Sequence, residues 1–401
     1  MVLKHLHISE LKPGMHVADP GIDWKTRPYL YCADEHISSM EQVRKIIEQG
    51  FQEVYIDLDR SDPVDAPPPL SAGEEFDKVT GTLSFKPTVS LDEELPKAVK
   101  VHDASVVYAR RFMNDMRAGK VNMTYATQSM ENILGSLERN ADALVSLSRL
   151  HQTDSYTYTH CVNVCIFATL FSRYRGADSN AIFAAGLAGM FHDLGKALVP
   201  LQILNAPRKL SDAEFAVMKA HPVLGYEQLA SVPGILPEVL LGTMQHHEKI
   251  NGTGYPQGLS GKDISDIGRM VGVADVYDAL TSKRPYKTAM YPHKALGIMY
   301  EMRDKDLDSE YLAQFIRMVG VYPVGSVVEM EDGSMGVVTA SNDEMPLKPT
   351  VTIVRNPDGK AIPSRIYNLA SDKDAPGIAR CIPSELTDIQ PAQVLGMSVG
   401  F

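Results

Sequence analysis

The sequence predicts a multidomain protein with a small α+β domain, an all-α central domain and a small β-rich C-terminal appendage. Three observations support this prediction. Proline and acidic residues are concentrated in residues 61–96, apolar residues recur at helical spacing in the middle of the chain, and strand-like runs separated by Asp-Gly turns follow residue 321. With 401 residues, 44% of them hydrophobic, the chain can form two or three domains with conventional cores.

The N-terminal α+β domain is expected over residues 1–60. Short runs broken by Pro13-Gly14 precede a helix-like segment around residues 38–49 and a strand-like segment at residues 53–57. Residues 61–96 include Pro67-Pro68-Pro69 among acidic side chains. Because this composition resists core formation, we predict an extended linker there.

Helical periodicity resumes near Pro96, and residues 97–153 are predicted to be connecting helices. Within residues 122–150 the apolar positions follow three- and four-residue spacing: Met123, Ala126, Met130, Ile133, Leu137, Leu144, Leu147 and Leu150. A helix of this length can connect a regulatory domain to a catalytic one.

Residues 154–320 are predicted to be entirely helical. Ser211 followed by Glu214 forms a capping-box pattern, and Pro237 suits the first turn of a helix. Residues 321–401 contain the runs Val-Val-Glu-Met, Met-Gly-Val-Val-Thr and Thr-Val-Thr-Ile-Val, separated by Asp332-Gly333 and Pro357-Asp358-Gly359. These runs predict a small β-barrel-like appendage.

Charge and cysteine content restrict the classes of function. A net charge of −11 argues against binding to a nucleic acid polymer or an anionic membrane, so an anionic substrate must be attracted by local cations or metals. The four cysteines are too dispersed for a disulfide framework, which favours a reducing compartment. The N-terminus lacks an apolar signal core, and the apolar runs 162–171 and 181–191 are shorter than a bilayer span. We therefore expect a cytoplasmic protein without a membrane span.

Five histidines and two aspartates in the helical region form a candidate two-metal hydrolytic centre: His160, His192, Asp193, His221, His246, His247 and Asp275. One such histidine alone is usually a hydrogen-bonded core residue, and one such aspartate is usually a helix cap. Their joint occurrence favours metal binding. Mixed imidazole and carboxylate donors suit two divalent transition-metal ions, with iron, manganese, nickel and zinc as candidates, whereas an oxygen-only set would indicate magnesium or calcium.

Local patterns indicate how these donors could meet. His192 and Asp193 end an apolar helix that starts near Asn180, and Gly195 would permit a sharp exit from it. His246 and His247 are adjacent, so they can share an ion only where their helix ends. Asp275 lies among apolar residues and needs a partner to offset its desolvation. The remaining histidines, together with Cys161 and Cys165, are expected to be structural or exposed.

The motifs His192-Asp193-Leu194-Gly195-Lys196 and His246 to Pro256 resemble those of the HD-GYP family of metal-dependent phosphodiesterases. The resemblance covers about residues 154–320, with all seven donors in the family order, and implies an HD-type helical catalytic domain. It implies that one ion is held by His160, His192, Asp193 and Asp275, and the other by His221, His246 and His247, with Asp193 as a catalytic bridge. Some three-metal members have a glutamate where Tyr156 stands here, which argues against a third ion.

The resemblance further implies that a hydroxide activated by two metals hydrolyses cyclic di-GMP to pGpG, which family members often cut again to GMP; the end product, pGpG or GMP, stays open. It implies that Lys196 contacts the scissile phosphate or protonates the leaving oxygen. The alternative is that Lys196 is an ordinary surface lysine. Arg284 and Lys287 match substrate-binding positions of the family and could clamp phosphate. Tyr255, beside Pro256, could form a wall for a base or a surface for a partner domain. In the family, the Gly-Tyr-Pro element has been linked to cyclic di-GMP synthases.

Two alternative functions remain at this stage. The substrate could be another cyclic dinucleotide or a phosphorylated nucleotide, because metal ligands define the reaction class more firmly than the base preference. The chain could instead be a non-catalytic cyclic di-GMP receptor or partner-binding module, although such proteins usually lack some ligands and none is missing here. A homodimer is a further candidate assembly. Residues 1–60 also resemble a small accessory domain found in such enzymes, through the segment Leu11-Lys12-Pro13-Gly14-Met15.

Overall fold

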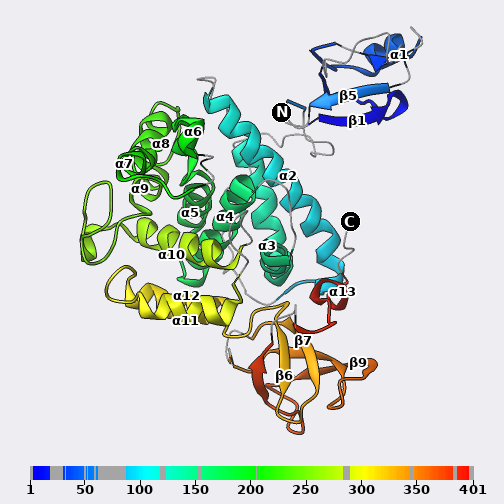
Figure 1. The fold of residues 1–401 in the computed structure, drawn as a ribbon, viewed down its shortest axis with the longest axis vertical. Helices are drawn as coiled ribbons and strands as arrows, with labels where there is room; N and C mark the ends of the chain where they lie inside the picture. The colour runs from blue at the N-terminus through cyan, green and yellow to red at the C-terminus, as the bar shows by residue number, and fades with distance from the viewer. Residues whose placement is uncertain are drawn as a thin grey trace.

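The computed structural model describes residues 3–18, 30–31, 33–48, 51, 53–57, 60–61, 87–117, 123–150, 156–204, 206, 208–282, 290–342, 345, 347–382 and 386–396. These residues form a small N-terminal α+β unit, a large helical domain and a C-terminal antiparallel sheet (Figure 1). The predicted multidomain fold class is therefore confirmed. No helix in the described ranges has both the length and the apolar character needed to cross a membrane.

The N-terminal unit is a mixed sheet covered by one helix. Its strands run in the order β1-β5-β2-β4, with β3 parallel to β5 and the other pairs antiparallel. Apolar side chains of the sheet and of the helix share one core, which includes Val17, Val43 and Ile56. The elements are β1 (Leu3–His7), η1 (Ile8–Glu10), β2 (His16–Val17), β3 (Leu30–Tyr31), β4 (Glu35–His36), α1 (Met40–Glu48) and β5 (Glu53–Asp57).

Helix α2 (Leu91–Arg117) begins inside the segment that the sequence predicts as linker. The backbone nitrogen of Glu93 donates to the hydroxyl of Ser90, and acidic side chains in the first turn favour the positive end of the helix dipole. Glu94 is fully buried and receives both guanidinium hydrogen bonds of Arg139 in α3. The last residues of the segment predicted as linker, 91–96, therefore start a helix, and residues 62–86 lie outside the described residues.

Helix α3 (Thr124–Leu150) follows the predicted apolar periodicity, but it is kinked at Asn140, where φ is −163° and ψ is 104°. The side chain of Asn140 accepts a hydrogen bond from the backbone nitrogen of Asp142 and donates one to the carbonyl of Val89. Asn140 therefore caps the second half of α3, and the single continuous helix predicted for residues 122–150 is wrong at this point.

The helical domain is organised around α4 (Tyr156–Tyr174), whose residues from His160 to Ser172 are all buried. Helix α4 packs against α2, α3, α5, α10 and α12. The predicted capping box at Ser211 and the first-turn proline Pro237 are both confirmed. The remaining elements of this domain are α5 (Ser179–Phe191), η3 (Leu194–Leu198), α6 (Leu201–Leu204), α7 (Asp212–Met218), α8 (His221–Ala230), α9 (Pro237–Gln245), η4 (Gly261–Asp263), α10 (Asp266–Thr281), α11 (Pro292–Glu301) and α12 (Ser309–Val319).

The C-terminal sheet is antiparallel, with the strand order β10-β6-β7-β8-β9. The three predicted runs form β6 (Val327–Met330), β7 (Met335–Ala340) and β8 (Thr350–Arg355), and Gly333 and Gly359 adopt positive φ in the predicted turns. Among the described residues, β9 and β10 are the two ends of this order and do not pair, so these strands form an open sheet. The remaining elements are β9 (Ala361–Asn368), β10 (Ile378–Cys381) and α13 (Pro391–Val394).

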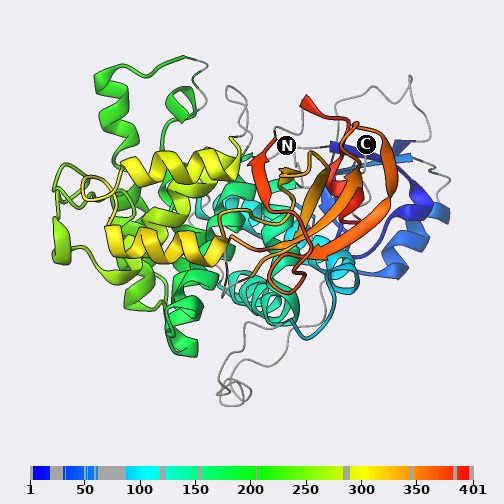
Figure 2. The same ribbon diagram turned by 90° about the horizontal axis from the view of Figure 1, so that it is seen from below.

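The sheet is attached to the second half of α3. The hydroxyl of Ser341 lies 2.8 Å from a carboxylate oxygen of Asp142, and the guanidinium of Arg149 donates to the carbonyl of Val324. Figure 2 shows α11 and α12 running side by side next to this sheet. Polar contacts therefore join the sheet to the helical domain beyond their connection through the chain.

Candidate metal centre

The structure brings all seven predicted donors together, although they lie on five separate helical elements. His160 is on α4, His192 and Asp193 follow α5, His221 begins α8, His246 and His247 follow α9, and Asp275 is on α10. They form two groups, one of His160, His192 and Asp275 and one of Asp193, His221, His246 and His247. Within each group, donor atoms from every residue lie within 4.8 Å of one another. No other group of this kind occurs among the described residues.

In the first group, the Nε2 atoms of two imidazoles face the two carboxylates. His160 Nε2 lies 3.1 Å from Asp275 Oδ1 and 3.8 Å from Asp193 Oδ2. His192 Nε2 lies 3.4 Å from Asp193 Oδ2 and 3.9 Å from Asp275 Oδ1. Two imidazole nitrogens and two carboxylate oxygens therefore converge on one point, an arrangement that suits a first-row transition metal.

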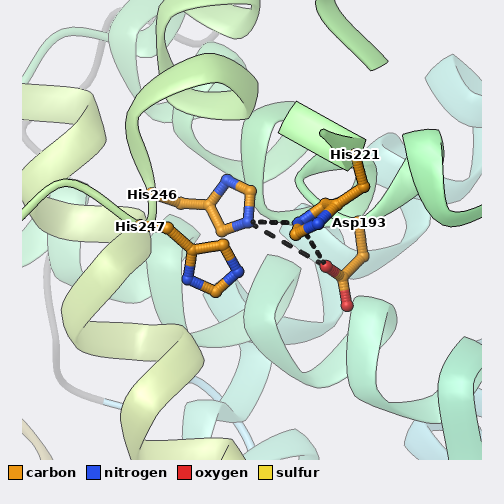
Figure 3. Close-up of side chains that lie close together, drawn as sticks. All are labelled: Asp193, His221, His246 and His247. Atoms are coloured by element: carbon orange, nitrogen blue, oxygen red, sulfur yellow. Dashed lines mark hydrogen bonds and ion pairs between the residues drawn. The ribbon is translucent and has the colours of Figure 1, made fainter. Parts of the chain in front are cut away.

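In the second group, imidazoles converge on the other oxygen of Asp193 (Figure 3). His221 Nε2 lies 3.3 Å from Asp193 Oδ1, and His246 Nε2 lies 3.9 Å from the same oxygen. The two Nε2 atoms are 3.2 Å apart. The carboxylate of Asp193 thus stands between the two groups, with one oxygen directed toward each.

The backbone orients three of these imidazoles. The Nδ1 atoms of His192, His221 and His246 lie 2.7, 2.8 and 2.8 Å from the carbonyl oxygens of Gly189, Met218 and Thr243, each three residues earlier. A carbonyl only accepts hydrogen bonds, so each Nδ1 carries the proton and each Nε2 offers its lone pair. This division is typical of histidines that bind metals.

The fourth imidazole, that of His160, is oriented by Asp278, which the sequence analysis did not identify. Asp278 Oδ2 lies 2.6 Å from His160 Nδ1, while its Oδ1 accepts hydrogen bonds from Asn163 and Ser282. Asn163 in turn lies 3.1 Å from His102 on α2. A second aspartate one helical turn after Asp275, in an apolar helix, is the sequence signal that could have revealed this role.

The site has the chemistry expected of a cation-binding centre. His192 Nε2 and Asp193 Oδ1 are buried and have no hydrogen-bond partner, an arrangement that is costly unless a cation lies between them. Burial and the neighbouring imidazole of His247 hold the pKa of His246 well below its ordinary value. Burial lowers the pKa of His160, but hydrogen bonds to Asp275 and Asp278 outweigh it and raise that pKa to about 9. The two buried atoms without partners and the low pKa of His246 therefore fit bound metal ions, and a bound cation would displace the extra proton of His160.

The role of Gly195 differs from the predicted one, which was to permit a sharp exit from the helix that ends at His192 and Asp193. It lies in the 3-10 helix η3, and its φ is not positive. A Cβ atom at this position would lie 1.9 Å from the carbonyl oxygen of His221 and 2.6 Å from the nitrogen of Gly225. Glycine is therefore required by the close approach of α8, which brings His221 to Asp193, and a sharp exit from α5 is not its role.

The side chains predicted to contact substrate lie at the open edge of the site. Lys196 Nζ is 2.6 Å from Asp193 Oδ2, and the ring of Tyr255 lies 4.7 Å from that of His247. The side chains of Lys196 and His247 are each 25% exposed, whereas that of Asp193 is 2% exposed. Solvent therefore reaches the centre from this side. Arg284 and Lys287 lie outside the described residues.

The loop that carries Tyr255 is held by Glu248, a second residue without a predicted role. Its two carboxylate oxygens accept hydrogen bonds from the backbone nitrogens of Gln257 and Leu259, at 2.7 and 2.9 Å. Glu248 is 8% exposed, so these bonds are largely shielded from water. Glu248 directly follows His247 in the sequence. It therefore holds the Gly-Tyr-Pro loop close to that histidine.

Replacing Asp278 by asparagine is expected to lower metal affinity and activity by about 10- to 100-fold, because an amide orients the His160 imidazole less firmly than a carboxylate does. Metal titration of the stripped protein and steady-state rates measure this effect. Asp266→Asn on the same helix removes a carboxylate that is 72% exposed, and should change little. Equal metal affinity in the unaltered and Asp278→Asn proteins would exclude this role.

Comparison with known families assigns the three parts of the chain. Residues 141–311 match the HD domain family, and residues 327–383 match a KOW domain associated with HD domains. Residues 3–126 match a domain of unknown function, DUF3391. The DUF3391 match therefore includes α2 as well as the N-terminal sheet, and the HD match includes all seven donors.

Several characterised proteins are similar to this chain. The cyclic di-GMP phosphodiesterase PA4108 of Pseudomonas aeruginosa is 32% identical over 386 residues, which cover 96% of this chain and 93% of that protein. The cyclic di-GMP phosphodiesterase response regulator RpfG of Xanthomonas campestris is 35% identical over 45% of this chain and 48% of its own. The 3'3'-cGAMP-specific phosphodiesterase 3 of Vibrio cholerae is 36% identical over 42% of this chain and 36% of its own length.

A helical domain with a buried cluster of histidines and aspartates defines the class of HD-type metal-dependent hydrolases. A solved structure shares this fold: Bd1817, an HDG"Y"P protein of Bdellovibrio bacteriovorus, superposes with a TM-score of 0.50 at 17% identity, over 78% of this chain and 98% of its own. With a relative similar over nearly its whole length, the chain belongs to the HD-GYP family of metal-dependent phosphodiesterases.

Proposed function

We propose that this protein hydrolyses cyclic di-GMP at a centre of two divalent transition-metal ions, with iron, manganese, nickel and zinc as candidates. The observation that carries the proposal is the position of Asp193. Its Oδ1 faces the imidazoles of His221 and His246, and its Oδ2 faces those of His160 and His192. A carboxylate placed in this way is suited to bridge two ions.

The proposed ligands follow the two groups. His160, His192 and Asp275 would hold one ion with Asp193, and His221, His246 and His247 would hold the other with the second oxygen of Asp193. When bound, two dications at these residues would supply a hydroxide at neutral pH and would neutralise the charge that develops on a phosphate oxygen. The buried imidazoles keep their Nε2 atoms directed at the centre, and the backbone carbonyls hold them there.

The side chains at the open edge are proposed to bind substrate. Lys196 would contact the scissile phosphate or protonate the leaving oxygen, and its ammonium already lies against the proposed bridging carboxylate. Tyr255 would wall one side of a base, next to His247. The phosphate clamp of Arg284 and Lys287 stays a prediction from the sequence.

Cyclic di-GMP is the proposed substrate because the relative that is similar over nearly the whole chain is named for it. Opening one phosphodiester would give pGpG, and a second cleavage would give GMP. A different cyclic dinucleotide is the second candidate, since the Vibrio cholerae relative is named for 3'3'-cGAMP. A non-catalytic receptor is disfavoured because none of the seven donors is lost.

The substrate is tested by incubating the purified protein with cyclic di-GMP and 3'3'-cGAMP in separate reactions and in competition. Mass spectrometry of the products distinguishes pGpG from GMP, and elemental analysis gives the metal and its stoichiometry. We expect cyclic di-GMP to be cleaved with the higher kcat/KM. A higher kcat/KM for 3'3'-cGAMP would transfer the proposal to the second substrate.

Removing the metals with a chelator should lower the hydrolysis rate on the order of a hundredfold or more, because this chemistry depends on the bound ions. The stripped protein should also unfold at a lower temperature, because the buried donors lose the cations that bind only the folded state. Adding Mn²⁺ or Fe²⁺ should restore both properties. Full activity in protein shown by elemental analysis to be metal-free would contradict the two-metal proposal.

The remaining parts of the chain are proposed to serve regulation. The N-terminal unit would respond to a signal and act on the helical domain through α2, which carries His102 and lies against α3 and α4. Cyclic di-GMP synthases are proposed partners of the Gly-Tyr-Pro loop, and a homodimer is a proposed assembly. Analytical ultracentrifugation of the full chain tests the homodimer.

A further inference from the structure

Lys219 is a cation beside the metal centre that forms no ion pair with any described residue. It follows α7, two residues before His221, and its Nζ lies 5.9 Å from the centre of the Tyr255 ring. The Tyr255 ring in turn lies 4.7 Å from that of His247. Tyr255 therefore links Lys219 to the metal centre, within the range that a substrate bound at the metals could extend.

Three other basic side chains near the site are paired with carboxylates. Lys196 lies 2.6 Å from Asp193, Lys249 lies 3.1 Å from Asp306, and Arg269 pairs with Asp266 and Asp308. Lys219 has no carboxylate within 4.0 Å among the described residues; its contacts are two aromatic rings. Its charge is thus available to an anion in a protein with a net charge of −11.

Phe215 stands next to this cation and is 48% exposed. It lies four residues before Lys219, and its ring centre is 5.4 Å from Lys219 Nζ. Helix α7 buries none of its residues, so the helical core does not account for the position of this aromatic side chain. A half-exposed aromatic ring beside an unpaired cation suits a nucleotide, because bases stack on aromatic faces and phosphates bind ammonium groups.

We propose that Phe215 and Lys219 form a second nucleotide subsite, which binds the half of a cyclic dinucleotide that is not being cleaved. This inference rests on the proposed function. A cyclic dinucleotide contains two phosphodiesters, and only one of them can occupy the metal centre at a time. Lys219 binds the second phosphate, Phe215 stacks on the attached base, and Tyr255 separates the two halves.

The test compares two substrates that differ in this second half. Cyclic di-GMP has a second phosphate and base, whereas bis(p-nitrophenyl) phosphate is a single phosphodiester without either. In the Lys219→Ala protein, kcat/KM for cyclic di-GMP should fall about tenfold more than kcat/KM for bis(p-nitrophenyl) phosphate, as expected for a lost charge-assisted hydrogen bond. Lys219→Arg should recover most of the loss, because it keeps the charge.

Phe215→Ala should show the same selective loss, and Phe215→Tyr should restore the stacking surface. Lys360→Ala is the matched control, since it removes one positive charge from an exposed turn of the C-terminal sheet and should leave both substrates unaffected. Equal losses for the two substrates in Lys219→Ala would show that Lys219 acts through His221 and would overturn the subsite. Unchanged kinetics of the Lys219→Ala protein with both substrates would also overturn the subsite.

The unaltered protein separates failure of the subsite from failure of the proposed function. If it hydrolyses cyclic di-GMP and the Lys219 and Phe215 variants do so equally well, only the subsite is wrong. If it hydrolyses bis(p-nitrophenyl) phosphate but neither cyclic di-GMP nor 3'3'-cGAMP, the proposed substrate class is wrong, and the subsite is rejected with it.

Discussion

Replacing Asp193 by alanine is expected to lower kcat on the order of a thousandfold or more, because the two ions would lose their shared ligand. Asp193 Oδ1 lies 3.3 Å from His221 Nε2 in one group, and its Oδ2 lies 3.4 Å from His192 Nε2 in the other, whereas Asp275 reaches the second group only at 4.0 Å from His247 Nδ1. If the centre holds the two proposed ions, the bound metal should fall from two ions per chain to one or none. The helical domain should stay folded, since its apolar core is built from other side chains around α4.

Asp193→Asn keeps the volume of the side chain and separates the loss of charge from the loss of packing. Circular dichroism should show unchanged helix content in both variants, while elemental analysis should show lost metal. Lys196→Ala is a useful comparison, because it removes the ammonium beside Asp193 but leaves all proposed ligands in place. Full turnover by Asp193→Ala would refute the bridging role.

Replacing Gly195 by alanine is expected to destabilise the helical domain by about 3 kcal/mol or more, because overpacking against fixed backbone cannot be relieved by a change of rotamer. The added Cβ would meet the carbonyl of His221 at 1.9 Å and the nitrogen of Gly225 at 2.6 Å. Helix α8 would have to move, and His221 would move with it away from Asp193. Metal affinity in the second group should therefore fall together with stability.

Gly297→Ala in α11 is the matched control for this prediction. A Cβ atom at Gly297 would meet nothing within 4 Å, so the substitution should stabilise the helix by about 0.5–1 kcal/mol through helix propensity. Thermal unfolding and metal titration of both variants give the comparison. An unfolding temperature for Gly195→Ala equal to that of the unaltered protein would show that the contact with α8 yields without cost.

Local patterns predicted the regular elements well where a local rule determines the structure. The capping box at Ser211, the first turn at Pro237 and the runs of β6, β7 and β8 follow from neighbouring residues alone. The predictions are wrong where a residue distant in the sequence determines the local structure. Arg139 of α3 pairs with Glu94 and supports the start of α2, and the carbonyl of Val89 holds the kink at Asn140. Neither partner can be read from the adjoining sequence.

The order and chemical type of the seven donors are properties of the sequence, and they were sufficient to predict a metal centre and its family. The tertiary structure alone decided how the donors are grouped, because they lie on five helical elements whose packing sets every distance between them. In the tertiary structure, one oxygen of Asp193 faces each of the two donor groups, and Asp278 orients the His160 imidazole. Gly195 lies in close contact with the backbone of α8. Spacing along a chain cannot specify contacts between separate helices, because these depend on the core that packs them together.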